Sequence, residues 1–116
     1  MTFIQNAVSY ASNHEIMITR VWHGRTALEK ADDYLQFLLN RGTEDYKKVN
    51  GNLSVRVWRK LDVDCAHFYT VTEWDNIASI REFAGEQYEK AVYYPEDHGI
   101  LLEFEEHVQH YESFVI

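Results

Sequence analysis

The chain of 116 residues is long enough for one domain with its own hydrophobic core. Its hydrophobic fraction of 46% and aromatic fraction of 15% exclude a disordered chain, and no apolar run approaches the roughly 20 residues of a membrane helix. The net charge of −8 falls mostly on residues 91–116, which contain six acidic residues and no lysine or arginine, so nucleic acid is not an expected partner.

The first part of the chain predicts a strand followed by a helix. Residues 1–15 show no clear period and are expected to form an N-terminal extension, so the single domain would be residues 16–116. Residues 16–23, with the sequence IMITRVWH, are rich in β-branched and aromatic side chains and predict the first strand. Apolar residues then recur at the spacing of an amphipathic helix as far as Leu39.

Two local signals set the expected limits of this helix. Thr26 stands three residues before Glu29, which is the spacing of a capping box at a helix start. Gly42 is expected to end the helix, because glycine adopts the left-handed conformation of a helix C-terminus without a Cβ clash.

The remainder of the chain predicts a hairpin, a second helix and a last strand. The expected elements are strands at 53–61 and 65–74, a helix from Asp75 or Asn76 to Gly85, a further helical turn or two within 86–94, and a strand at 107–116. Pro95 should stop any helix before it.

The order of these elements, β-α-β-β-α-β, is that of the ferredoxin-like fold. We therefore expect an α+β domain with an antiparallel sheet and helices on one face. Large apolar side chains occupy both faces of the strands, among them Trp22, Trp58, Phe68 and Trp74. A second copy of the chain is expected to cover the open face, giving a homodimer in which the two sheets form an α+β barrel.

Five segments between positions 20 and 112 carry a resemblance to a known family. They are RVWHG at 20–24, WD at 74–75, FAG at 83–85, EKAVYYPED at 89–97 and HYE at 110–112. Together they resemble the dimeric α+β barrel proteins, and among them the antibiotic-biosynthesis-monooxygenase-like (ABM-like) branch. The resemblance implies a homodimer with a small-molecule cavity in each subunit. It also implies, for one group of members, oxidation of small aromatic, polyketide-like substrates to quinones with O₂ and no cofactor.

Other members of this family bind and degrade haem. They have an asparagine on the first strand and a histidine after the tryptophan that Trp74 matches. Here the first strand has no asparagine and position 84 is alanine, so haem degradation is not expected. The quinone-forming members also use an asparagine and a tryptophan, of which Trp74 alone has a match. The glycines are isolated and no Cys/His cluster has metal-ligand spacing, so neither a cofactor nor a metal is expected.

His110 is the first candidate catalytic residue. On a strand it shares a face with Val108 and Glu112, whereas His107 points to the opposite face, so the two histidines do not form a joint metal site. His110 is either a hydrogen-bonded core histidine or a general base in the cavity, a role that suits an ordinary histidine pKa of ~6.5.

Arg20 and Trp74 complete the candidate catalytic set, and Trp22 is a candidate ligand-binding residue on the same face of the first strand as Arg20. An arginine among β-branched neighbours needs a partner if it is buried. That partner is either a carboxylate of the acidic C-terminal segment, such as Glu112, or the anionic group of a ligand.

His67 and Tyr69 share a face of the third strand, where they serve either one ligand or the packing of the barrel. Cys65 is expected to be a small buried hydrophobe, because no basic residue adjoins it in the sequence. A single cysteine cannot form an internal disulfide, and the first residues lack a signal-peptide pattern, so we expect a cytoplasmic protein.

Tyr93 and Tyr94 precede Pro95, the chain's single proline, and are the remaining candidate ligand-binding residues. They are expected to point in different directions, one toward the core or the cavity rim and the other toward the partner subunit. A lid over the cavity, or a redox or acid role for the tyrosines, are the alternatives.

Three hypotheses of function follow. The first is a cofactor-independent monooxygenase acting on a small aromatic substrate through His110, Trp74 and Arg20. The second is a non-catalytic module that binds a small molecule. The third is a structural dimer with a filled barrel, which predicts no cavity above the ~300 Å³ that a drug-sized ligand needs.

Overall fold

The computed structural model describes residues 16–116. Its elements in chain order are β1 (Ile16–Thr26), η1 (Leu28–Lys30), α2 (Ala31–Phe37), η2 (Leu38–Gly42), α3 (Glu44–Lys47), β2 (Asn52–Leu61), β3 (Ala66–Trp74), α4 (Ile77–Ala84), η3 (Pro95–Asp97) and β4 (Gln109–Phe114). The extension expected at residues 1–15 lies outside the described residues. Every helix within 16–116 is too short or too polar to span a lipid bilayer.

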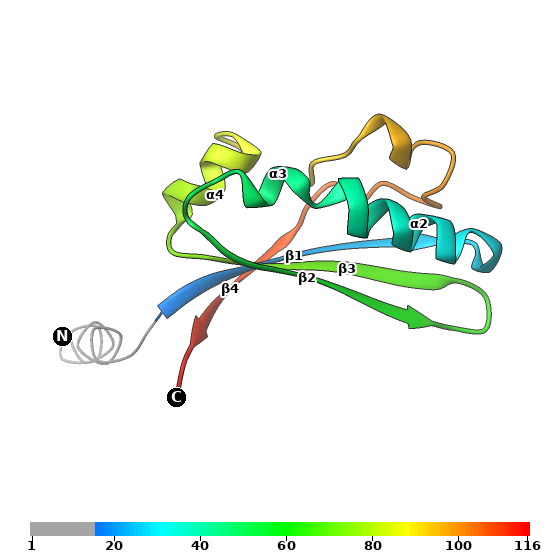
Figure 1. Ribbon diagram of the computed structural model, residues 1–116, viewed down its shortest axis with the longest axis horizontal. Coiled ribbons are helices and arrows are strands. Elements are labelled where there is room, and N and C mark those ends of the chain that lie inside the picture. The colour runs from blue at the N-terminus through cyan, green and yellow to red at the C-terminus, as the bar shows by residue number, and fades with distance from the viewer. Residues whose placement is uncertain (1–15) are drawn as a thin grey trace.

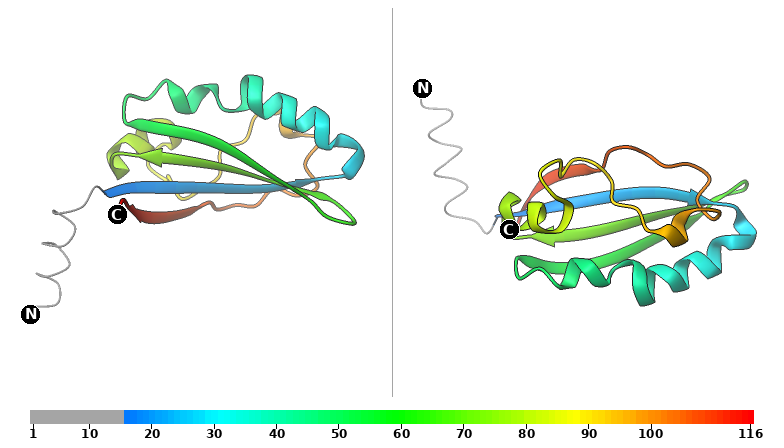
Figure 2. Two further views of the ribbon diagram at one scale, coloured as in Figure 1. Left: turned by 60° about the horizontal axis from the view of Figure 1, so that its bottom comes forward. Right: turned by 90° about the horizontal axis from the view of Figure 1, so that it is seen from above.

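The four strands form one antiparallel sheet in the order β2-β3-β1-β4. Helices α2, α3 and α4 lie on one face of this sheet, together with the segment that contains η3 (Figure 1). The opposite face carries no helix of residues 16–116 (Figure 2). The connectivity and the one-sided placement of the helices confirm the predicted ferredoxin-like α+β fold.

The first strand is longer than predicted, and this removes the predicted capping box. β1 continues to Thr26 because it pairs with β3 as far as the partners Thr26 and Ala66. The Thr26 hydroxyl donates to the carbonyl oxygen of Ala27 at 2.9 Å, so it is not a helix cap for Glu29. The helical region that follows starts at Ala27 without a side-chain cap.

Gly42 was expected to end the helix in a left-handed conformation. The position is confirmed, because η2 ends at Gly42, but the left-handed conformation is wrong. Among the described residues, positive φ angles occur at Gly85 and Gly99. Gly42 is instead buried, and a Cβ atom there would lie 2.9 Å from Cε2 of Phe37. The Thr43 hydroxyl donates to the carbonyl oxygen of Leu38 at 2.8 Å, which satisfies the wide turn of η2 and lets the chain continue into α3.

The limits predicted for the second helix are confirmed. The Asn76 side chain accepts a hydrogen bond from the backbone N–H of Ser79 at 3.0 Å, and Gly85 ends α4 with a φ of 87°. The helical turns predicted within residues 86–94 are absent from the structure. Residues 87–90 form a single turn instead, closed by the hydrogen bond from the N–H of Lys90 to the carbonyl oxygen of Gln87 at 3.0 Å. Lys90 also forms a β-bridge with His107, and the carbonyl oxygen of Glu89 accepts a hydrogen bond from the N–H of Val108. The last strand is correspondingly shorter than predicted and begins at Gln109.

The core between the sheet and the helices consists of two clusters. The larger cluster is formed by Trp22, Ala31, Tyr34, Leu38, Ala66, Phe68, Leu101 and Val108. The smaller cluster is formed by Tyr46, Trp74 and Ile80, with Ile18 packed against it. Arg20 lies between Ile18 and Trp22 on the same face of β1, and therefore between the two clusters.

The uncovered face of the sheet carries large exposed aromatic side chains among polar ones, and we call it the open sheet face. It contains a shallow hollow of about 630 Å³ lined by Thr19, Val21, Trp58, Tyr69, Val71, Tyr111, Glu112 and Ser113. Trp58 and Tyr111 keep 53% and 55% of their surface exposed. An exposed patch of this composition is typical of a surface that meets a partner.

Candidate functional site

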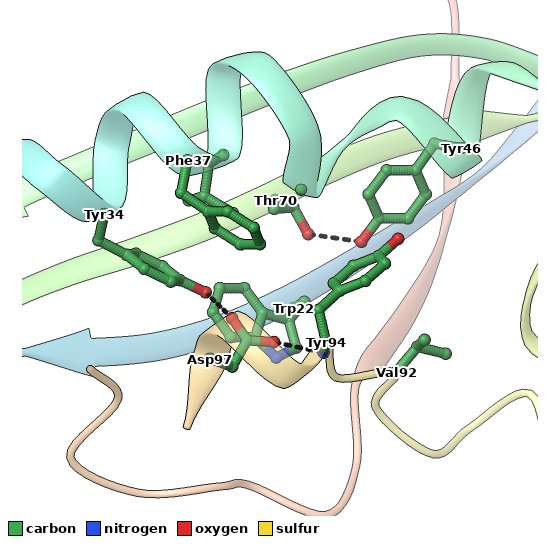
Figure 3. Close-up of a pocket in the computed structure, with 10 residues that line it drawn as sticks. Trp22, Tyr34, Phe37, Tyr46, Thr70, Val92, Tyr94 and Asp97 are labelled. Atoms are coloured by element: carbon green, nitrogen blue, oxygen red, sulfur yellow. Dashed lines mark hydrogen bonds between the residues drawn. The ribbon is translucent and has the colours of Figure 1, made fainter. Parts of the chain in front are cut away.

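The cavity between the helices and the sheet is nearly filled by aromatic side chains. It is lined by Trp22, Tyr34, Phe37, Leu38, Gly42, Tyr46, Thr70, Val92, Tyr94 and Asp97, and we call it the Trp22 cavity (Figure 3). Its volume is about 10 Å³, which accommodates no more than one water molecule. In this structure, therefore, Trp22 and Tyr94 line a packed interior and no ligand-sized space.

Asp97 is buried beside this cavity and joins three segments of the chain. Its Oδ1 atom accepts a hydrogen bond from the Tyr34 hydroxyl at 2.8 Å, and its Oδ2 atom accepts one from the backbone N–H of Tyr94 at 2.7 Å (Figure 3). Burial raises the pKa of the Asp97 carboxyl, and burial together with the nearby carboxylate raises the pKa of Tyr34. The Tyr34–Asp97 bond fixes η3 against α2.

Tyr93 and Tyr94 point in different directions, as expected. The Tyr93 hydroxyl donates to the carbonyl oxygen of Glu105 at 2.6 Å, and its ring meets Trp22 edge-on with 6.2 Å between centroids. The Tyr94 hydroxyl donates to Oδ2 of Asp45 at 2.9 Å. Both side chains anchor the segment before Pro95 to the domain.

Arg20 is the most deeply buried charged side chain of the described residues, with 1% of its surface exposed. Its Nη2 atom donates to the carbonyl oxygen of Lys90 at 3.1 Å, and its guanidinium carbon lies 5.3 Å from the centre of the Phe83 ring. Its Nε atom has no hydrogen-bond partner. Among the described residues Glu112 does not form an ion pair with it, contrary to one of the two expectations: Arg20 lies opposite His110 on β4, and Glu112 lies two residues further on, opposite Ile18.

His110 lies directly opposite Arg20 in the antiparallel pairing of β1 with β4. Burial, and secondarily the positive charge of Arg20, lowers the pKa of the His110 imidazole. The ring packs edge-on against Tyr88 with 5.2 Å between centroids, and its Nε2 atom is buried without a hydrogen-bond partner. The Nε2 atom therefore does not have the hydrogen bond that was expected if His110 were a hydrogen-bonded core histidine.

An open hollow of about 400 Å³ begins at His110, and we call it the His110 hollow. It is lined by Ile77, Tyr88, Glu89, His107, Val108, Gln109 and His110. The residue after Glu89 is Lys90, whose carbonyl oxygen holds the Arg20 guanidinium. Arg20 itself does not line the hollow, and His110, its pairing partner on β4, is the lining residue that lies opposite it in the sheet.

Trp74 is fully buried and reaches this region through Phe83. Its indole N–H donates to the Thr72 hydroxyl at 2.8 Å. Its ring lies 5.9 Å from that of Phe83, the same ring that Arg20 covers. Trp74 therefore supports the position of Arg20 from within the core.

His67 and Tyr69 lie on the open sheet face, away from Arg20 and His110. His67 belongs to a chain of contacts that the sequence did not reveal: Glu105 is hydrogen-bonded to His23 Nδ1 (2.6 Å), His23 Nε2 is hydrogen-bonded to His67 Nδ1 (2.9 Å), and His67 Nε2 lies 3.1 Å from a carboxylate oxygen of Asp62.

Cys65 has two basic neighbours that are distant in the sequence. Its sulfur lies 3.6 Å from Nε2 of His67 and 3.9 Å from Nη1 of Arg25. The residue is buried, as expected for a small hydrophobe, but the expectation that no basic group would adjoin it holds only along the sequence.

The arrangement at Arg20 and His110 can remove a proton and stabilise the anion that results. A neutral imidazole with a free nitrogen is a general base, and a buried guanidinium stabilises negative charge more strongly than an exposed one. Within residues 16–116, no group of three or more His, Cys, Asp or Glu side chains could hold a metal ion.

Comparison with known proteins shows the fold alone. No family model and no curated protein matches the chain. Among solved structures, a candidate antibiotic biosynthesis monooxygenase from Bacillus cereus matches with a TM-score of 0.55 and 10% sequence identity, over 87% of this chain and 93% of that chain. The resemblance seen in the sequence is therefore confirmed at the level of the fold.

Proposed function

We propose that this protein is a cofactor-independent monooxygenase that oxidises a small aromatic substrate at a C–H bond made acidic by a neighbouring carbonyl group. The observation that carries the proposal is His110, which lines an open hollow of about 400 Å³, lies opposite the buried Arg20 in the sheet, and has an Nε2 atom that is buried without a hydrogen-bond partner. The solved structure that shares the fold is described as a candidate monooxygenase, which agrees with this reaction class.

The proposed reaction needs only the substrate, O₂ and this pair of side chains. Neutral His110 takes a proton from the substrate CH₂ group, and Arg20 stabilises the carbanion, whose charge is delocalised onto the carbonyl oxygen. Electron transfer to O₂ and recombination form a C–O bond, and His110 returns its proton to the peroxide. The hydroperoxide then loses water to form a new carbonyl, so that CH₂ and O₂ become C=O and H₂O.

We further propose that two copies of the chain form a dimer through the open sheet face. The uncovered Trp58 and Tyr111 on this face support the arrangement, because a second sheet would remove their apolar surface from water. Each subunit would keep its own His110 hollow, which lies on the helix-covered side. A cytoplasmic location is part of the same proposal, since the unpaired Cys65 remains reduced there.

Oxygen uptake with anthrone as the probe substrate tests the proposal. The purified protein should consume one O₂ for each anthraquinone formed, and His110→Gln should lower the rate to that of buffer. His98→Gln is the matched control, because His98 is exposed and its ring stacks on Phe104. Neither of these residues lines the His110 hollow. Equal rates for His110→Gln and the unmodified protein would contradict the assignment of His110.

A further inference from the structure

Arg20 is a buried cation without a carboxylate. No ion pair among residues 16–116 includes it, and its contacts are the Lys90 carbonyl, the Phe83 ring and the Tyr46 hydroxyl. Burying an ionised group without a counter-charge costs on the order of several kcal/mol of folding free energy. A position that keeps such a charge therefore calls for an explanation.

Three of the five other arginines show that carboxylates were available to the fold. Arg25, Arg41 and Arg59 each form an ion pair, with Glu103, Glu96 and Asp32 respectively, although all three are more exposed than Arg20. The chain has 19 acidic residues and 11 basic ones, so the missing partner does not reflect a shortage of acids.

The atoms without a partner point to the missing group. Arg20 Nε and His110 Nε2 are both buried and unpaired, and the two residues face each other across β1 and β4 on the helix-covered side. An N–H of a guanidinium requires an acceptor, and a negatively charged oxygen is the strongest one. Because the net charge of −8 repels anions over long distances, an anion would bind this protein only at a local cation such as Arg20.

We infer that the substrate is an aromatic acid whose ring occupies the His110 hollow and whose carboxylate binds the buried Arg20 once the His110 ring shifts to admit it. This inference rests on the proposed function for the oxidation step, but binding of the acid does not depend on turnover. The carboxylate would hold the reacting C–H bond at His110, so Arg20 has a positioning role as well as an electrostatic one.

A matched pair of fluorescent probes tests this on the unmodified protein. 9-Anthracenecarboxylate and 9-anthracenecarboxamide have the same ring system and differ in charge. A charge-assisted hydrogen bond to a buried guanidinium should make the carboxylate bind about tenfold more tightly or better. Equal affinities, or tighter binding of the amide, would overturn the inference without any mutation.

Two variants locate the selectivity. Arg20→Met should abolish the preference for the carboxylate, leaving the two probes within about twofold of each other. Arg81→Met is the control, because it removes the same charge from an exposed position. The guanidinium carbon of Arg81 lies 5.3 Å from the centre of the Tyr88 ring, which lines the same hollow. Loss of the preference in Arg81→Met but not in Arg20→Met would show long-range attraction and would refute the Arg20 site.

The outcomes separate this inference from the proposed function. Preference for the carboxylate without oxygen uptake would uphold the acid site and refute the oxygenase. Oxygen uptake with no preference for the carboxylate would uphold the oxygenase and refute the acid site.

Discussion

The Tyr34 hydroxyl donates to Asp97 at 2.8 Å across 63 positions of sequence, and this bond joins α2 to the turn that contains the chain's single proline. The opposite oxygen of Asp97 accepts from the backbone of Tyr94. A buried carboxylate with two donors holds the segment between α4 and β4 against the helices, and this segment forms one wall of the His110 hollow.

Asp97→Ala should therefore destabilise the domain. The substitution leaves the Tyr34 hydroxyl and the Tyr94 N–H without acceptors in a buried place, at a cost of about 2–4 kcal/mol, whereas Tyr34→Phe removes one donor at about 1–2 kcal/mol. Urea unfolding measures both. Tyr94→Phe is the control, because Asp45, the acceptor of the Tyr94 hydroxyl, is partly exposed and can turn to water. If Asp97→Ala unfolds at the same urea concentration as the unmodified protein, Asp97 does not fix this segment.

The stability of the domain should depend on pH through His110. Its pKa is lowered in the folded state, so between the ordinary histidine pKa and this lower value the unfolded chain binds more protons. Stability is then full above the ordinary value of ~6.5 and falls as the pH drops below it. The melting temperature should fall between about pH 7.5 and about pH 5.5 by less in His110→Gln than in the unmodified protein. The raised pKa of Asp97 changes stability with pH in the opposite direction. The quantity to compare is therefore the difference in melting temperature between the unmodified protein and His110→Gln at each pH.

Arg20→Met should not destabilise the domain, although the residue is almost fully buried. Methionine fills similar space and removes an unpaired charge, and such replacements of buried ions are often neutral or stabilising by about 1–4 kcal/mol. We expect an unchanged or higher melting temperature together with the loss of carboxylate binding. A large fall in melting temperature would show that Arg20 serves the fold and would remove the reason to assign it to a ligand.

Trp58→Asp should convert the proposed dimer into a monomer. Trp58 is 53% exposed on the open sheet face, so the substitution spares the core and places a charge where a second sheet would dock. Leu39→Asp is the matched control, because Leu39 is equally exposed at 53% but lies on η2, on the helical side. Light scattering after size-exclusion chromatography gives the masses. A dimer in both variants, or a monomer in the unmodified protein, would contradict docking through this face.

The sequence predicted the fold because its signals are local and independent of each other. Alternation in β2 and β3 identified the hairpin, and the pair Asn76 and Gly85 identified both ends of α4. Its failures came where tertiary contacts overrode local patterns. Thr26 has the spacing of a cap but pairs with Ala66, and Gly42 looks like a helix end but is needed for its lack of a side chain beside Phe37.

The site was harder to predict, because its interpretation depends on which hydrogen-bond and ion-pair partners Arg20 and His110 lack in the folded structure. The alternation of β1 placed Arg20 and Trp22 on one face, but only the structure shows that Arg20 forms no ion pair with a carboxylate of residues 16–116. The chain from Glu105 through His23 to Asp62 was missed altogether. Strand alternation would have placed His23 on the other face of β1 from Trp22, which is the face of His67. The pairing register of β1 with β3 was needed to show that the His23 and His67 rings meet.

Exchange of the acidic C–H of the probe substrate tests the central claim most directly, because it isolates proton removal by His110 from oxidation. Anthrone deuterated at its CH₂ position would be incubated without O₂, and the loss of deuterium followed by NMR. The unmodified protein and His98→Gln should accelerate the exchange, and His110→Gln should exchange at the rate of buffer. Exchange that the protein does not accelerate, or that His110→Gln accelerates equally, would contradict the account.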